Sequence, residues 1–341
     1  MNLERLKWVD CAKGIAIILV VMGHALTFFS PNLNLGVRII YSFHMPLFFI
    51  LTGIVSAYSY EKLKFKEFTI HKVKSLMVPY LIFAIPLLIY KLFRDYFNGN
   101  LKIDETMILN TVFITRKSFI SGLWFLPCLL VAQCIMHFIM RCTSKKVRLI
   151  LVFIFFIGIL ILKEMIDLPL PLNLDNALFI LPFITVGIEW KKYRDRNESL
   201  HLKWWFIVII IFIFIGINIL SIYLDHSIIY FADILFDNVL FMFLMGISGS
   251  LIVISIAENI KGSIQRIFEY CGKRSLFIYG VHYIVLGVVF QILKRLWRPI
   301  NLIECSIFII IETIIIIILI LFLKEKLISD IISIVRIKEN E

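Results

Sequence analysis

Three ionisable residues interrupt the first apolar run of the chain, residues 8–29: Asp10, Lys13 and His24. A run of about 20 apolar residues can span a bilayer, and ionisable groups persist in such spans mainly where they face a protein interior, a cavity or a substrate. Lys13 and His24 are eleven residues apart, which places them on one helix face about 16 Å apart along the axis. We therefore identify His24 as a candidate general base and Asp10 as a second candidate catalytic residue.

A second histidine, His44, opens the next apolar run, residues 41–59, just before Pro46. The first span leads outward and the second returns, so we expect His24 and His44 to approach each other in the outer half of the membrane. Two histidines and an acid at that depth suit proton transfer. The alternative, that each imidazole is an interfacial residue with a purely structural role, stays open, above all for His44.

Lysines are concentrated in the segment that follows, and two of them, Lys72 and Lys74, come just before Pro79. Most of these lysines are explained by membrane topology alone. A second interpretation is a phosphate-binding site at the inner surface, to which Lys13 would contribute.

Later segments offer weaker candidates. Trp124 is predicted near the outer interface, and Tyr279 and His282 lie in the apolar part of a late run, so all three are candidate substrate-binding residues. A structural role is an equally good explanation for His282. The loop with Asp225, His226 and Asp233 lacks the spacing of a metal site, and we predict no metal.

Composition identifies the class of protein to which these residues belong. The chain has 341 residues, of which 60% are hydrophobic and 17% charged, and its mean hydropathy is +0.94. This predicts an all-α polytopic membrane helix bundle. The net charge of +11 is explained by basic cytoplasmic loops, and we expect no binding of nucleic acid. The cysteines show no paired spacing, so we expect no disulfide framework.

Roughly ten apolar runs are separated by polar segments. Their approximate ranges are 8–29, 41–59, 76–93, 119–140, 149–162, 176–190, 204–222, 233–256, 275–293 and 301–323. With this alternation, 25 of the 35 Lys and Arg residues fall on one side, which places both termini in the cytoplasm. We expect one transmembrane domain, 1–323, and a cytoplasmic tail, 324–341, that forms an amphipathic helix at the membrane surface.

Several stretches together resemble the acyltransferase-3 family of integral-membrane acyltransferases. They are WVDCAKGI at 8–15, VVMGH at 20–24, FHMPLFF at 43–49, TG at 52–53, KSLMVPY at 74–80, LWFL at 123–126, LPF at 181–183 with Gly187, and SLFIYGVH at 275–282. The first two motifs look most like the branch described as fucose 4-O-acetylase-like or intercellular-adhesin-type polysaccharide acyltransferases. One departure is Lys13, where many relatives have Arg, which holds a phosphate as a fork rather than as a point charge. No esterase-like extracellular domain is fused to the run of spans.

The resemblance implies an O-acyltransferase, most simply an O-acetyltransferase, of the cell membrane. Acyl-CoA would be the co-substrate, with its phosphates near Lys13, Lys74 and Lys72, and a sugar hydroxyl of a lipid-linked or nascent polysaccharide would be the acceptor. His24 would act as general base or as a transient acyl carrier, and His44 would orient the hydroxyl or shuttle its proton. Membrane lipids, glycan-synthesis proteins or a second copy of the chain are the expected partners.

Two other classes of protein compete with this expectation. A proton-coupled transporter or exporter of lipid-linked glycan would also need intramembrane histidines, although no clear internal repeat supports it. A structural membrane subunit would leave the alignment of Lys13 and His24 unexplained.

Overall fold

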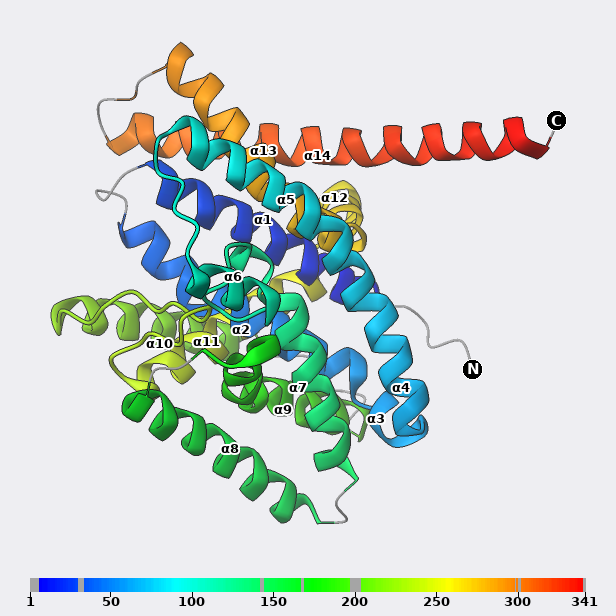
Figure 1. Ribbon diagram of the computed structural model, residues 1–341. Helices are drawn as coiled ribbons and strands as arrows, with labels where there is room; N and C mark the ends of the chain where they lie inside the picture. Colours follow the sequence, from blue (N-terminus) through cyan, green and yellow to red (C-terminus); the bar gives the residue numbers. More distant parts are fainter. Residues whose placement is uncertain are drawn as a thin grey trace. The chain divides into compact units, whose positions relative to one another are not determined.

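The computed structural model describes residues 6–29, 34–141, 144–166, 169–196, 204–297, 299 and 302–339, and side chains only as far as 325. Within these ranges the chain is helical and no extended strand forms, which confirms the all-α prediction. The principal helices, drawn in Figure 1, are α1 Lys7–Phe29, α2 Asn34–Ser56, α3 Ser59–Lys62, α4 Phe65–Lys72, α5 Val78–Phe97, α6 Glu105–Val112, α7 Phe125–Met140, α8 Lys145–Ile166, α9 Leu174–Arg196, α10 Trp204–Tyr223, α11 Val239–Asn259, α12 Gly262–Lys273, α13 Ser275–Leu296 and α14 Leu302–Glu339.

Nine segments in the described ranges are long and apolar enough to cross a membrane, and each corresponds to a predicted run. The remaining run, 119–140, contains a shorter helix. Its first residues form turns and the 3-10 helix η3 Ser121–Leu123, and α7 then spans 16 residues, with Pro127 in its first turn. Proline lacks an N–H and is tolerated in a first turn, so the helix begins here and falls short of the length of a full span.

Two features between and beyond the spans add to the expectation. Residues 257–275 were expected only to be a polar segment between two runs, and they include α12, an amphipathic helix. The tail expected at 324–341 continues α14 as helix as far as Glu339, and whether its side chains make it amphipathic concerns residues outside the described ranges.

The chain folds into two compact units, residues 1–40 with 257–341, and residues 41–256. In the first unit α1 packs against α12, α13 and α14. Two glycines set the spacing between α1 and α12. A Cβ atom on Gly14 would lie 1.9 Å from the carbonyl oxygen of Phe268, and one on Gly272 would lie 1.7 Å from that of Asp10. Small residues of this kind allow helix backbones to approach closely in membranes.

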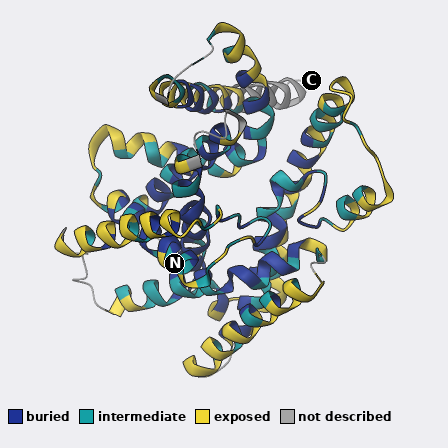
Figure 2. Ribbon diagram, turned by 90° about the vertical axis from the view of Figure 1, so that its left-hand side faces the viewer, coloured by how far each residue is buried: buried dark blue, intermediate teal, exposed yellow. Residues whose placement is uncertain are grey.

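In the second unit α9 packs against α7 and α8. The same device brings α2 and α9 together, because a Cβ on Gly53 would lie 2.1 Å from the carbonyl oxygen of Ile184, and one on Gly187 would lie 2.0 Å from that of Ile50. Many large apolar side chains of α8 and α10 are exposed, and Figure 2 shows such helix faces in yellow. Helices that are apolar all round are typical of segments that contact lipid.

Candidate active site

The first unit places His24 beside two residues of α13. The hydroxyl oxygen of Tyr283 lies 3.2 Å from Nδ1 and 3.3 Å from Nε2 of His24, and the two rings are 4.6 Å apart. The ring of His282 lies 5.2 Å from that of His24 and 4.5 Å from that of Tyr283. These three side chains, which we call the α1–α13 cluster, lie in membrane-spanning segments.

His282 has one defined ring nitrogen in this cluster. Its Nδ1 lies 2.7 Å from the backbone carbonyl oxygen of Tyr279, which can only accept, so Nδ1 carries the proton and donates. In the neutral imidazole Nε2 then holds a lone pair, and this atom is buried without a hydrogen-bond partner among the described residues. A fully buried polar atom of this kind is uncommon and marks a place where a substrate group could bind.

The cluster has the components of a proton-transfer site. An imidazole can accept a proton from a hydroxyl group, and a phenol oxygen that accepts from the N–H of one ring nitrogen fixes the ring so that the other, unprotonated nitrogen can act as the base. His24 is only half-buried, so its ring is the accessible member, whereas His282 is fully buried.

Lys13 and Asp10 lie further along α1. The helix runs without a break from Lys7 to Phe29, which confirms that Lys13 and His24 share one helix. Lys13 is half-buried and Asp10 is 3% exposed, at the close contact between α1 and α12. Asp10 is therefore enclosed by protein.

His44 belongs to the second unit. It is 5% exposed, and its ring lies 5.0 Å from that of Tyr41, which makes an edge contact with Tyr230. Because His24 and His44 lie in different units, their predicted approach stays a prediction.

Lys72 and Lys74 flank the start of a π-helical turn, η2 Val73–Met77, in the second unit. The Lys72 ammonium lies 3.4 Å from the Ser56 hydroxyl and 5.2 Å from the centre of the Phe68 ring. Lys74 is exposed. π-helical turns often occur at functional sites, and the exposed Lys74 is the better placed of the two for a ligand from solution.

The other candidates are divided between the units. Trp124 is half-buried in the second unit, and its ring lies 6.4 Å from each of Phe49 and Phe125. Tyr279 belongs to the first unit and contributes its carbonyl group to the α1–α13 cluster, while its ring lies 5.9 Å from that of His282.

Three residues of interest were missed from the sequence. Tyr283 was passed over as an ordinary aromatic residue of a span. Glu312, in α14, is fully buried, and neither carboxyl oxygen has a hydrogen-bond partner in the described part of the chain. An acid in the middle of an apolar run was a visible signal for it. Arg116, counted only as a topology signal, forms a buried ion pair with Asp175 at 2.7 Å.

No group of three or more potential metal ligands gathers among the residues that the structure describes. In the loop that contains Asp225, His226 and Asp233, the His226 ring instead packs 5.1 Å from that of Phe241.

Comparison with known proteins identifies the family to which the chain belongs. A search of curated proteins and a search of solved structures each found no match to the chain. A sequence model of the acyltransferase-3 family, described as an acyltransferase domain, matches residues 6–323, which include every candidate residue named above. With nearly its whole length matched and with helices fit to cross a membrane many times, the chain belongs to the acyltransferase-3 family and is a multi-pass membrane acyltransferase.

Proposed function

We propose that the protein transfers an acyl group, most simply acetyl, from cytoplasmic acyl-CoA to a hydroxyl group of a cell-envelope or exopolysaccharide sugar. The single observation that carries this proposal is the α1–α13 cluster, in which a half-buried imidazole, His24, is held by a phenol inside a membrane-spanning helix. Membership of an acyltransferase family supplies the reaction class. The branch that acylates polysaccharides, and the plasma membrane as location, belong to this proposal.

The reaction requires one base. A ring nitrogen of His24 removes the proton of the sugar hydroxyl as its oxygen attacks the thioester carbonyl. The C–O ester bond forms, the C–S bond breaks, and the proton on His24 passes to the departing CoA thiolate. A thioester is already activated, so the step balances without a further reactant. Tyr283 orients the ring of His24, and the free Nε2 of His282 can accept a hydrogen bond from a bound substrate.

Acyl-CoA would enter from the cytoplasm. Its phosphates would be held by Lys13 and the exposed Lys74, with a smaller contribution from Lys72, whose ammonium already contacts Ser56. Lysine acts as a point charge toward phosphate, so several lysines together are needed for tight binding.

The acceptor would approach from the opposite side of the membrane. In this proposal His44 orients the hydroxyl or relays its proton, and Trp124 and Tyr279 contact the sugar. Asp10 stabilises the end of α1 that carries Lys13. Aromatic rings and imidazoles offer both apolar surface and hydrogen bonds, which suits a carbohydrate. Export of lipid-linked glycan, the competing function, is disfavoured because the matched family model is described as an acyltransferase domain.

The decisive experiment compares wild type, His24→Ala and a control, His71→Ala, in which an exposed histidine of α4 is removed. O-acetyl groups on surface glycan are measured by NMR, together with the total amount of exported glycan. We expect His24→Ala to abolish acetylation with glycan export unchanged, and His71→Ala to behave as wild type. Full acetylation with lost export would establish the transporter function instead.

The donor site is tested separately. Lys13→Glu should weaken binding of acetyl-CoA to the purified protein, whereas Lys66→Glu, which alters an exposed lysine of α4, should not. Equal affinity in Lys13→Glu and wild type would remove Lys13 from the donor site.

A further inference from the structure

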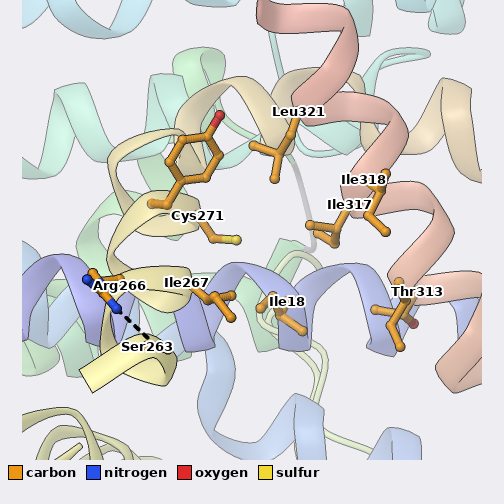
Figure 3. A pocket seen from close by; sticks show the side chains of 11 residues that line it. Ile18, Ser263, Arg266, Ile267, Cys271, Thr313, Ile317, Ile318 and Leu321 are labelled. Atoms are coloured by element: carbon orange, nitrogen blue, oxygen red, sulfur yellow. Dashed lines mark hydrogen bonds between the residues drawn. The ribbon is translucent and has the colours of Figure 1, made fainter. Parts of the chain in front are cut away.

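The first unit contains an apolar groove of about 620 Å³ that the proposed reaction does not use. Figure 3 shows Ile267 and Cys271 of α12 facing Ile317 of α14 across this space, with Ile18 of α1 between them. Ser263 and Arg266 lie at one end of the groove. A volume of this size is in the range of pockets that bind small ligands.

The groove lies where lipid tails are the available apolar partner. Its α1 and α14 walls belong to membrane-spanning segments, Lys7–Thr27 and Ile303–Glu325. Its third wall, α12, joins two spans and is too short and too polar to cross a bilayer, as expected of a helix at the membrane surface. Burial raises the pKa of the Cys271 thiol, so this side chain stays neutral.

Side chains of α12 and α14 join the two helices at one place. The Tyr270 hydroxyl donates to the Glu325 carboxylate at 2.9 Å, and the Arg274 guanidinium donates to the same carboxylate at 2.6 Å while lying 3.5 Å from the centre of the Tyr270 ring. This contact ties the end of α12 to α14, and the groove lies between the preceding residues of α12 and α14.

The charges of α12 indicate which lipid would fit. Lys273 pairs with Glu269 at 2.5 Å, and Arg274 pairs with Glu325. Arg266 instead donates to the Ser263 hydroxyl at 3.0 Å, and no carboxylate contacts it in the described ranges. An exposed guanidinium beside a hydroxyl group at the mouth of an apolar groove suits a phosphate with an attached acyl chain.

We propose that this groove binds one acyl chain of an anionic membrane phospholipid, with the lipid phosphate on Arg266 and Ser263. The chain fills the space between α12 and α14, and the headgroup lies at the membrane surface. The bound lipid would hold α12 in place against α1, next to the close contact at Asp10.

The test uses the purified full-length protein in nanodiscs that contain trace phosphatidylglycerol or phosphatidylcholine with a photoactivatable group in one acyl chain. Cross-linked peptides are mapped by mass spectrometry. We expect the anionic probe to label segments 263–271 and 313–321 several-fold more than the zwitterionic probe. Ile318→Trp, which fills the groove from an exposed position, should lower this labelling several-fold, whereas Ile310→Trp, exposed on the same helix outside the groove, should not.

The headgroup contact is tested with Arg266→Gln, which should remove the preference for the anionic probe. Arg295→Gln, an exposed cation at the far end of α13, should keep it. Uniform labelling of all lipid-facing helices, or equal effects of the two tryptophan variants, would overturn the proposal. So would loss of lipid labelling at 313–321 together with intermolecular cross-linking of this segment by an added bifunctional protein cross-linker, which would show that a second copy fills the groove. None of these measurements depends on acyl transfer.

Discussion

The hydroxyl oxygen of Tyr283 lies almost equally far from the two ring nitrogens of His24, at 3.2 and 3.3 Å. In a neutral imidazole one of these nitrogens carries the proton and can donate to the phenol oxygen, while the other holds the lone pair that a base requires. The ring of the same tyrosine also lies 4.5 Å from that of His282, with an angle of 40° between the ring planes. Tyr283 therefore links the accessible imidazole to the buried one.

The first prediction concerns this link. Tyr283→Phe keeps the ring and removes the hydroxyl group, so His24 loses one neutral hydrogen bond, worth about 0.5–1.5 kcal/mol. We expect kcat to fall roughly 3- to 10-fold with KM for acetyl-CoA unchanged, because the ring of His24 is no longer held by this bond.

Tyr223→Phe, which alters an exposed tyrosine of α10, is the matched control and should have no effect. A Tyr283→Phe enzyme with unchanged kcat would assign the phenol a packing role only.

The sequence was sufficient for the membrane spans but not for everything between them. Hydropathy identified nine spanning segments because long apolar runs have few alternative structures. The helix α12 was not predicted, because its 12 residues include Arg266, Glu269 and Lys273 and lack the length and hydropathy of a span. The role of its apolar face can be inferred only when the neighbouring helices α1 and α14 are known.

The candidate site was predictable in its parts and not in its assembly. His24 and His282 could be chosen because ionisable residues in spans are costly. The contact of His24 with Tyr283 joins positions 259 residues apart, and no local pattern in a single chain encodes such a pairing. Glu312 meets the same criterion as His24, because it is an ionisable residue inside a long apolar run.

The second prediction concerns the close contact of α1 and α12. Gly14→Ala places a methyl group within 1.9 Å of the Phe268 carbonyl oxygen, so the helices must separate. We expect a loss of roughly 1–3 kcal/mol of stability, seen as a lower midpoint of thermal unfolding in detergent.

Gly158→Ala and Gly216→Ala are the controls for this contact, because nothing lies within 4 Å of a Cβ at either position. Both should leave the midpoint unchanged or raise it slightly, since alanine favours a helix. An equally stable Gly14→Ala protein would contradict the tight packing of α1 on α12.

The third prediction concerns the buried ion pair of Arg116 and Asp175, whose side chains are each 4% exposed. Asp175→Asn leaves a buried guanidinium without its charge partner, and breaking such a pair costs about 3–5 kcal/mol. The double variant Arg116→Met with Asp175→Leu removes both charges and should recover most of that loss. Thermal unfolding in detergent measures both effects.

The surface pair of Lys192 and Glu61 provides the comparison, because Glu61 is 45% exposed. Glu61→Gln should cost less than about 1 kcal/mol. Similar losses for Glu61→Gln and Asp175→Asn would show that burial does not set the strength of the inner pair.

The fourth prediction concerns the titration of Tyr58, between α2 and α3. Its hydroxyl donates to the Asp195 carboxylate at 2.5 Å, and this bond, with a smaller effect of burial, raises the pKa of Tyr58 from 10.0 to about 12. Because the folded pKa is the higher one, the bond stabilises the fold at pH below about 10 and is lost as the pH rises through about 12.

The absorbance of tyrosinate in wild type minus that in Tyr58→Phe isolates this group among the twelve tyrosines. The difference should titrate near pH 12. A difference curve centred near pH 10 would show that Tyr58 does not donate to Asp195 in the folded protein.

The last prediction concerns Glu312, which is fully buried in α14 with no partner for its carboxyl group among the described residues. Burial of an unsatisfied polar group costs about 1–3 kcal/mol, so Glu312→Leu should raise the midpoint of thermal unfolding. Thr313→Val is the matched control. It should not raise the midpoint, because the Thr313 hydroxyl already donates to the Ile309 carbonyl at 2.7 Å.

A residue that weakens the fold is expected to contribute elsewhere, and α14 packs against α1 and α13, the helices that carry the α1–α13 cluster. We therefore expect Glu312→Leu to be more heat-stable than wild type and less active in acyl transfer. Glu312→Gln, which keeps the shape and hydrogen-bonding capacity but cannot ionise, separates the two explanations. If Glu312→Gln keeps activity and Glu312→Leu loses it, the carboxyl group of Glu312 forms a hydrogen bond to substrate. If both variants lose activity, the carboxyl group transfers a proton. A Leu variant that is less stable than wild type would show that the carboxyl group has a partner in the folded protein.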